Sequence, residues 1–260
     1  MFGRLKDLFG AGDRSPASPG AEALAPEAPL YVVGDIHGRA DLLNRALKLI
    51  EKHRDAGSAS AKTVFVGDYI DRGPESAKVL ATLYSMQQSD PDRIICLKGN
   101  HESMLLEFVD DPAERGGRWL INGGSETLDS YGIEGLHPKS DAEDMMEAGD
   151  AMAAAMPEGL MKWLRALPLT YRSGNVIVTH AAMDPDLAPE DQSDKVLLWG
   201  HREFLTRPRE DEFWVAHGHT IMKQAHCHSS RIAVDTGAYR TEILTVAAIR
   251  QGGCEFLQTK

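Results

Sequence analysis

Three short segments, far apart in the chain, place acidic, imidazole or amide side chains directly after an apolar run. They are Gly-Asp-Ile-His-Gly at 34–38, Gly-Asp-Tyr-Ile-Asp-Arg-Gly at 67–73 and Gly-Asn-His-Glu at 99–102. Carboxylate oxygens, imidazole nitrogens and an amide oxygen are ligands that two neighbouring divalent cations take from a protein. Such a cation pair clamps the attacking and leaving oxygens of a phosphoryl displacement. The pattern therefore predicts metal-assisted phosphoryl chemistry.

Two histidines in the second half of the chain, His180 and His219, also follow apolar runs. A single Gly-Asp or Gly-His pair is explained more simply as a turn, but these sets together indicate one shared metal site. Alternate residues of an extended strand end point to the same side. We therefore expect Asp35 and His37 to reach one cation together and Asp68 to bridge both cations. The expected metal ligands are Asp35, His37, Asp68, Asn100, His180 and His219.

The elements that must position these residues alternate between strand and helix patterns. Short apolar runs predict buried strands at 30–34, 62–67 and 93–97, and helical spacing follows them at 41–52, 75–87 and 101–109. This strand–loop–helix unit occurs three times in succession, which predicts a largely parallel sheet covered by helices. Such folds bind ligands in the loops after the carboxyl ends of their strands, and all three motifs lie in those loops.

The remainder of the chain is predicted to be mainly helical over 119–167 and rich in strands after that. The later strands are expected at 169–172, 175–179, 213–216, 231–235 and 242–250. Two of them end in candidate ligands, one at His180 and one in the segment 217–220. We therefore expect strand ends from both halves of the chain to converge on one point.

The composition favours one catalytic domain preceded by a tail. Of the 260 residues, 42% are hydrophobic and 26% are charged, a globular balance that can bury a large core. Residues 11–29 are rich in Ala, Pro, Gly and Ser and cannot form a core of their own. We predict a flexible N-terminal tail over 1–28 and a catalytic domain over 29–260.

Charge and cysteine content limit the classes of partner and compartment. The formal net charge is −11 and the sequence has no basic stripe, so nucleic acid is not expected as a partner. The three cysteines have unrelated spacings, which favours a reducing, cytoplasmic compartment over a disulfide framework. The sequence has no apolar stretch of membrane-spanning length, so we expect no stable membrane insertion. The oligomeric state stays open.

Together with Thr-His-Ala at 179–181 and Gly-His-Thr at 218–220, the three motifs resemble the PPP-type phosphoprotein phosphatases within the calcineurin-like metallophosphoesterases. Trp-Leu-Ile-Asn-Gly-Gly at 119–124 and Asp-Thr-Gly-Ala at 235–238 are similar to the compact bacterial and phage branch. The resemblance implies an α/β fold, a four-layer α/β/β/α sandwich of two mixed sheets between helical layers.

The resemblance also implies two divalent metal ions and their ligands. Asp35, His37 and Asp68 would bind the first ion. The second ion would be bound by Asp68, Asn100, His180 and His219. A hydroxide bridging the two ions would then attack phosphorus in line. Manganese is the metal that we expect to activate the enzyme in vitro, with iron or zinc as alternatives.

The remaining roles concern proton transfer and phosphate binding. By resemblance, His101 is the general acid that protonates the leaving alkoxide, and Asp71 holds its other ring nitrogen. Arg72 would bind two phosphate oxygens through its forked guanidinium. Related enzymes grip the phosphate with a further arginine shortly after a tryptophan, a place that His201 or Arg202 fills here. We favour Arg202, because a permanent cation suits a phosphate dianion.

The predicted function is a metal-dependent phosphomonoester hydrolase that acts on phosphorylated proteins as a Ser/Thr phosphatase, with phosphotyrosine as a further candidate substrate. The alternative is a symmetrical diadenosine tetraphosphate hydrolase. That related group typically lacks the aspartate found here at Asp71 and has aspartate in place of Glu102, so both residues favour the protein phosphatase. A third hypothesis is an inactive module that binds phosphoproteins. The complete set of predicted metal ligands argues against it.

Overall fold

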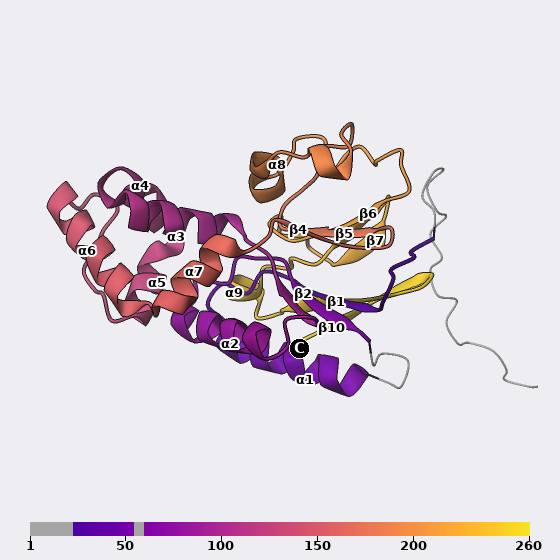
Figure 1. Ribbon diagram of the computed structural model, residues 1–260, viewed down its shortest axis with the longest axis horizontal. Helices are drawn as coiled ribbons and strands as arrows, with labels where there is room; N and C mark the ends of the chain where they lie inside the picture. The colour runs from indigo at the N-terminus through magenta and orange to yellow at the C-terminus, as the bar shows by residue number, and fades with distance from the viewer. Residues whose placement is uncertain (1–22, 55–59) are drawn as a thin grey trace, which may run out of the picture.

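The computed structural model describes residues 23–54 and 60–260, which form two facing β-sheets with helices on their outer sides (Figure 1). The first sheet has the order β10–β9–β1–β2–β3. Its parallel strands are β1 (Leu30–Val33), β2 (Lys62–Phe65) and β3 (Ile94–Cys96). Its antiparallel strands are β9 (Thr245–Arg250) and β10 (Gly253–Gln258), so this sheet is mixed.

The second sheet has the order β4–β5–β6–β8–β7 and is also mixed. Its parallel centre consists of β5 (Val176–Thr179), β6 (Trp214–His217) and β8 (Arg231–Ala233). Antiparallel strands form both edges, namely β4 (Thr170–Ser173) and β7 (His226–His228).

Strand register brings the carboxyl ends of the parallel strands to a common level. In the first sheet Val33 lies opposite Phe65, and Phe65 lies opposite Cys96. Alternate side chains of β1 enter different cores: Val32 joins the apolar cluster between the two sheets, whereas Tyr31 packs toward the helices. This two-sided burial explains why the strand is apolar throughout rather than alternating in polarity.

Helices cover both outer faces of the sandwich (Figure 1). The first sheet is covered by α1 (Ala40–His53) and α2 (Ser76–Ser89). The second sheet is covered by α8 (Asp194–Trp199), whose Leu197 packs in one cluster with Ile177 of β5 and Val215 of β6. A 3₁₀ turn (Pro189–Asp191) precedes α8 along the chain. The predicted four-layer α/β/β/α arrangement of two mixed sheets is thereby confirmed.

A group of helices extends from one end of the sandwich, to the left in Figure 1. Its members are α3 (Asn100–Asp110), α4 (Pro112–Trp119), a π-helical turn (Leu120–Gly124), α5 (Ser125–Ser130), α6 (Ala142–Ala155) and α7 (Glu158–Ala166). A last short helix, α9 (Ala238–Thr241), lies between β8 and β9 along the chain. The helical middle of the chain is therefore as predicted.

Two edge strands were not predicted from the sequence. β7 contains only His226, Cys227 and His228, which carry no apolar pattern, and β10 begins at Gly253, directly after another glycine. With β9, β10 turns a sheet that was expected to be largely parallel into a mixed one. Such short segments become strands because they pair with a neighbouring strand, and their own residues give little indication of it.

The described end of the predicted tail, residues 23–28, packs against the second sheet. Leu24 is buried in the cluster between the sheets, and the Ala25 N–H donates a 2.7 Å hydrogen bond to Asn175 Oδ1. Residues 1–22, the rest of the predicted tail, lie outside the described residues. Among the described helices, none has the length and apolar character needed to cross a membrane.

Candidate metal centre

The loops after β1, β2, β3, β5 and β6 converge, as predicted from the sequence, but not through extended strand ends. Five residues of these loops have a backbone φ in the left-handed region: His37 (46°), Asp68 (52°), Asp71 (71°), Arg72 (68°) and His219 (61°). Non-glycine residues adopt this conformation rarely and at an energetic cost. The strained turns re-aim the side chains toward a common centre, and such strain is typical of functional sites.

Glycines allow the loops to approach one another. Gly67 has φ 110°, and a Cβ placed on it would lie 2.5 Å from the backbone nitrogen of Gly99. Glu102 then joins the same two loops, since its carboxylate accepts 2.8 Å hydrogen bonds from the backbone N–H groups of Asp68, Tyr69 and Gly99. Glu102 therefore caps the start of α3 and fixes the loop that carries Asp68.

One group of candidate ligands consists of Asp68, Asn100, His180 and His219. His180 Nε2 lies 2.8 Å from Asn100 Oδ1 and 3.4 Å from Asp68 Oδ1, and His219 Nδ1 lies 2.9 Å from Asn100 Oδ1. Burial lowers the pKa of His180 to about 4 and also lowers the pKa of His219. Both imidazoles are therefore neutral near pH 7, the state in which histidine binds a metal.

The proton on His180 shows why a cation fits here. Its Nδ1 lies 3.1 Å from the carbonyl oxygen of Val66, and since a carbonyl only accepts, Nδ1 carries the hydrogen. Nε2 then carries a lone pair, which faces the oxygens of Asn100 and Asp68. Several electron-pair donors converging without a proton between them suit a divalent cation.

A second group forms around the other oxygen of Asp68. His37 Nε2 lies 3.6 Å from Asp68 Oδ2, and His101 Nε2 lies 3.8 Å from it. His37 Nδ1 donates a 2.8 Å hydrogen bond to the carbonyl of Ile70, which leaves Nε2 as the lone pair. Burial lowers the pKa of His37 to about 3. Asp68 thus belongs to both groups, which is the bridging position predicted for it.

Asp35 sits next to these groups, and a further carboxylate accompanies it. Burial first, and then the charges of Asp235 and Asp68, raise the pKa of Asp35. Burial also raises the pKa of Asp235 to about 6. Both carboxylate oxygens of Asp35 accept hydrogen bonds from the backbone N–H of His219, at 3.0 and 3.2 Å. Three buried carboxylates near one another repel each other unless cations compensate their charge, so this cluster also fits divalent metal ions.

The residues predicted for proton transfer form a buried pair. His101 Nδ1 lies 2.6 Å from Asp71 Oδ2, and both side chains are at most 1% exposed. Burial opposes a charged His101, but the charge of Asp68 and the hydrogen bond of Asp71 outweigh it and raise the pKa of His101. The pair is therefore built to keep a proton on the imidazole, as a general acid requires.

Two further residues of the site were not predicted. Trp119 Nε1 donates a 2.9 Å hydrogen bond to Asp71 Oδ2, and Thr127 Oγ1 donates a 2.6 Å hydrogen bond to Asp71 Oδ1. They belong to the helical group that follows α3, about fifty residues from Asp71, so no local spacing connects them. The signal that was available is the segment 119–124, whose role the sequence left open.

Arg72 faces the centre of the site and Arg202 does not contact it. Arg72 Nη1 lies 3.0 Å from His37 Nε2, and its Nη2 lies 3.1 Å from His101 Nε2. The guanidinium carbon lies 4.9 Å from the ring centre of Tyr239, a further neighbour that the sequence did not reveal. Arg202 is 86% exposed and its described ion pair is with Glu203. A phosphate contact by Arg202 stays a prediction.

A sequence profile of the calcineurin-like phosphoesterases matches residues 28–244. The chain belongs to this family. It is 29% identical over 236 residues to serine/threonine-protein phosphatase 1 of Salmonella typhimurium, which covers 85% of this chain and 92% of that protein. It is also 28% identical over 158 residues to a symmetrical bis(5'-nucleosyl)-tetraphosphatase of Nitrosococcus oceani, covering 60% of this chain and 44% of that protein.

Other relatives match over shorter stretches. The chain spans 21% and 34% of the length of two Caenorhabditis elegans relatives, with 42% and 36% identity over 83 and 86 residues. Among solved structures, a "putative diadenosine tetraphosphatase" superposes with a TM-score of 0.61 at 19% identity, covering 91% of this chain and 98% of that chain. This likeness supports the fold. Membership of the family supports a metal-binding hydrolase.

Proposed function

We propose that this metallophosphoesterase is a protein phosphatase that hydrolyses phosphoserine and phosphothreonine in phosphorylated proteins. The observation that carries the proposal is the buried pair of His101 and Asp71, whose atoms Nδ1 and Oδ2 lie 2.6 Å apart. Serine and threonine leave as alkoxides, which are poor leaving groups and need a proton as the P–O bond breaks. A protonated imidazole held by a buried carboxylate supplies that proton.

The neighbouring residues support binding of a phosphate group in the same place. Arg72 spans His37 and His101 with its two Nη atoms, so its guanidinium lies where a phosphate beside His101 would meet it. A planar fork of donors matches two phosphate oxygens. When bound, a pair of divalent cations would activate water and neutralise the phosphate charge. We propose manganese for activity in vitro, held by the six predicted ligands.

The second candidate is hydrolysis of dinucleoside tetraphosphates, which is the activity named for the Nitrosococcus relative. The leaving group of that reaction is a phosphate anion, which needs less protonation than an alkoxide. Asp71 and the three side chains that bond to its carboxylate would then contribute little to turnover. This chemical difference favours the protein phosphatase.

One comparison tests the proposal. The catalytic efficiency, kcat/KM, of the manganese-loaded protein is measured on a phosphoserine peptide and on diadenosine tetraphosphate under the same conditions. A large preference for the peptide is expected. A large preference for the dinucleotide would overturn the protein phosphatase and leave the metallophosphoesterase chemistry in place.

A further inference from the structure

Two cysteines face each other at one edge of the sandwich, away from the candidate metal centre. Cys227 lies on β7, the edge strand of the second sheet, and Cys254 lies on β10, the edge strand of the first sheet. In the strand register Cys227 is opposite Ile232, and Cys254 is opposite Ile249. Both isoleucines belong to the apolar cluster between the sheets, and both cysteines pack against that cluster.

The two thiols contact each other across the gap between the sheets. The side chains of Cys227 and Cys254 interact directly, and this interaction lowers the pKa of the Cys227 thiol. The same interaction and burial raise the pKa of the Cys254 thiol. Since a thiolate is the nucleophilic form of cysteine, the opposite pKa directions favour Cys227 as the attacking sulfur and Cys254 as its partner. Both side chains are half-buried rather than sealed off.

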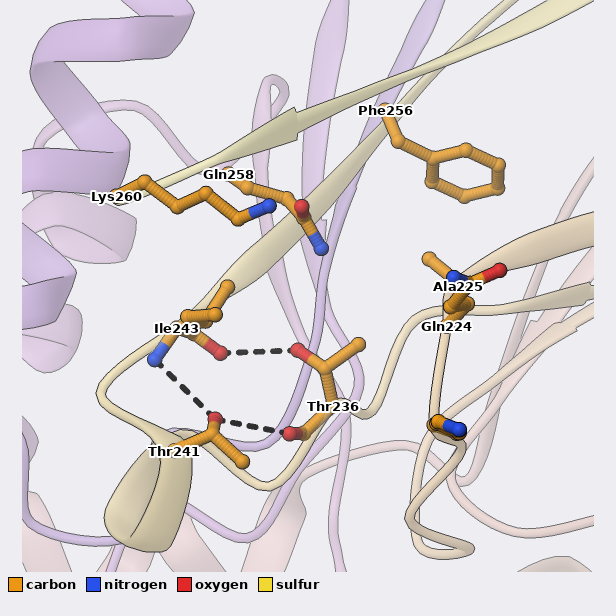
Figure 2. Close-up of a pocket in the computed structure, with 9 residues that line it drawn as sticks. Gln224, Ala225, Thr236, Thr241, Ile243, Phe256, Gln258 and Lys260 are labelled. Atoms are coloured by element: carbon orange, nitrogen blue, oxygen red, sulfur yellow. Dashed lines mark hydrogen bonds between the residues drawn. The ribbon is translucent and has the colours of Figure 1, made fainter.

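A cavity of about 380 Å³ is lined by residues that precede β7 and by residues that follow Cys254 on β10. Ala225 directly precedes β7, and Phe256 belongs to β10; each is two residues from a cysteine and shares its side of the chain. Figure 2 shows these two residues at one end of the cavity, with Thr241 and Ile243 at the other. The half-buried thiols therefore lie within two residues of the lining of this cavity.

We propose that Cys227 and Cys254 are a reversible oxidation site, at which hydrogen peroxide converts the thiol pair into a disulfide that joins the two sheets. The Cys227 thiolate attacks one oxygen of the peroxide, so that an S–O bond forms, the O–O bond breaks and hydroxide leaves. Cys254 then attacks the sulfenic sulfur of Cys227, the S–S bond forms, and water leaves. Overall, two thiols and one peroxide give one disulfide and two waters. The site depends on neither the metal ions nor the proposed phosphatase activity.

The third cysteine is an internal control. Cys96 is fully buried on β3, and burial raises its pKa, so it is expected to resist peroxide. Trypsin separates the three residues, because it releases Cys96 in peptide 94–98, Cys227 in peptide 224–231 and Cys254 in peptide 251–260. A disulfide of the proposed pair would therefore appear as a cross-link between two defined peptides.

The experiment treats the full chain with hydrogen peroxide, blocks remaining thiols with iodoacetamide and analyses non-reduced tryptic peptides by mass spectrometry. The expected result is a cross-link between peptides 224–231 and 251–260 that disappears with dithiothreitol, in the wild type and equally in Cys96→Ala. Full alkylation of both cysteines after peroxide would overturn the proposal. A cross-link that involves Cys96, or one between two chains, would overturn it as well.

Single substitutions test the order of the two steps. In Cys254→Ser, dimedone should trap a sulfenic acid on Cys227, whereas Cys227→Ser should show little trapping on Cys254. Equal trapping in both variants would overturn the assignment of Cys227 as the attacking sulfur. If a serine variant does not fold, Cys254→Ala and Cys227→Ala replace it in the same experiment.

The stability of the protein gives an independent test. The midpoint of urea unfolding of the wild type should rise on oxidation and fall back on reduction, with no shift in either variant. An unchanged wild-type midpoint would contradict a disulfide that joins the sheets.

Discussion

The indole N–H of Trp119 and the imidazole of His101 share one carboxylate oxygen, Oδ2 of Asp71, at 2.9 and 2.6 Å. Asp71 is fully buried, and its other oxygen accepts the hydroxyl of Thr127 at 2.6 Å. A buried carboxylate that is satisfied on both oxygens has one orientation available to it. Through it, the helical group that carries Trp119 and Thr127 fixes the imidazole of the proposed general acid.

Removing the Trp119 hydrogen bond should therefore slow catalysis without removing metal. In Trp119→Phe the aromatic packing against Phe108 is kept, while the donor to Asp71 is lost. A hydrogen bond to a charged group is worth about 1.5–3 kcal/mol, so kcat on a phosphoserine peptide should fall about tenfold or more. Metal content should match the wild type. A variant with unchanged kcat would show that Trp119 only fills space.

The role of His101 can be separated from metal binding by the choice of substrate. His101→Asn should lose kcat strongly on a phosphoserine peptide, whose alkoxide needs a proton, and far less on p-nitrophenyl phosphate, whose leaving group does not. Its Nε2 lies 3.8 Å from Asp68 Oδ2, so metal content must be measured in parallel. Equal losses on both substrates with full metal content would argue against His101 as the acid.

Asp68 is expected to be the ligand whose loss removes both cations. One of its oxygens lies 3.4 Å from His180 and the other 3.6 Å from His37, in the two separate candidate groups. Asp68→Ala should bind neither ion and lose roughly a thousandfold or more in kcat/KM, because the activated water and the charge compensation depend on them. Elemental analysis of the purified variant checks the prediction. Retention of one ion per chain would show that Asp68 does not bridge.

Two arginines offer a matched test of phosphate binding. Arg72→Lys keeps a positive charge but loses the fork that contacts His37 and His101, so KM for a phosphopeptide should rise about tenfold or more. Arg202→Ala removes an exposed side chain whose described partner is Glu203. If Arg202 binds phosphate as the sequence suggests, the KM of Arg202→Ala for the phosphopeptide should rise as well. An unchanged KM in that variant would leave Arg72 as the phosphate-binding arginine.

Some elements of the fold are encoded in local sequence patterns, and others form only through tertiary contacts. Strands such as β1 and β5 are buried on both faces, so their apolar runs were visible without the structure. The predicted metal ligands follow such apolar runs directly, so the same pattern pointed to them. Trp119, Asp235 and Tyr239 were not found, because their contacts with Asp71, Asp35 and Arg72 join segments that only the tertiary fold brings together. β7 and β10 were missed because pairing, rather than their own composition, makes them strands.

The carboxylate cluster predicts a pH-dependent stability in metal-free protein. Burial raises the pKa of Asp235 from 3.8 to about 6, so the folded state holds this proton more tightly than the unfolded state. The stabilisation is complete below about pH 4 and is lost as the pH rises through 6, a change of up to about 3 kcal/mol in the free energy of unfolding. His37 and His180, whose pKa values burial lowers, act in the opposite direction over the same range.

The difference between wild type and Asp235→Asn isolates the carboxylate, since both proteins contain the same histidines. Urea unfolding of chelator-treated protein from pH 4 to pH 7 should show the wild type losing stability relative to Asp235→Asn as the pH rises. Because cations compensate the charges of Asp35, Asp68 and Asp235, adding manganese at pH 7 should remove most of that difference. A difference that stays constant with pH would mean that Asp235 is already ionised in the folded, metal-free protein, and that the cluster tolerates its negative charge without cations.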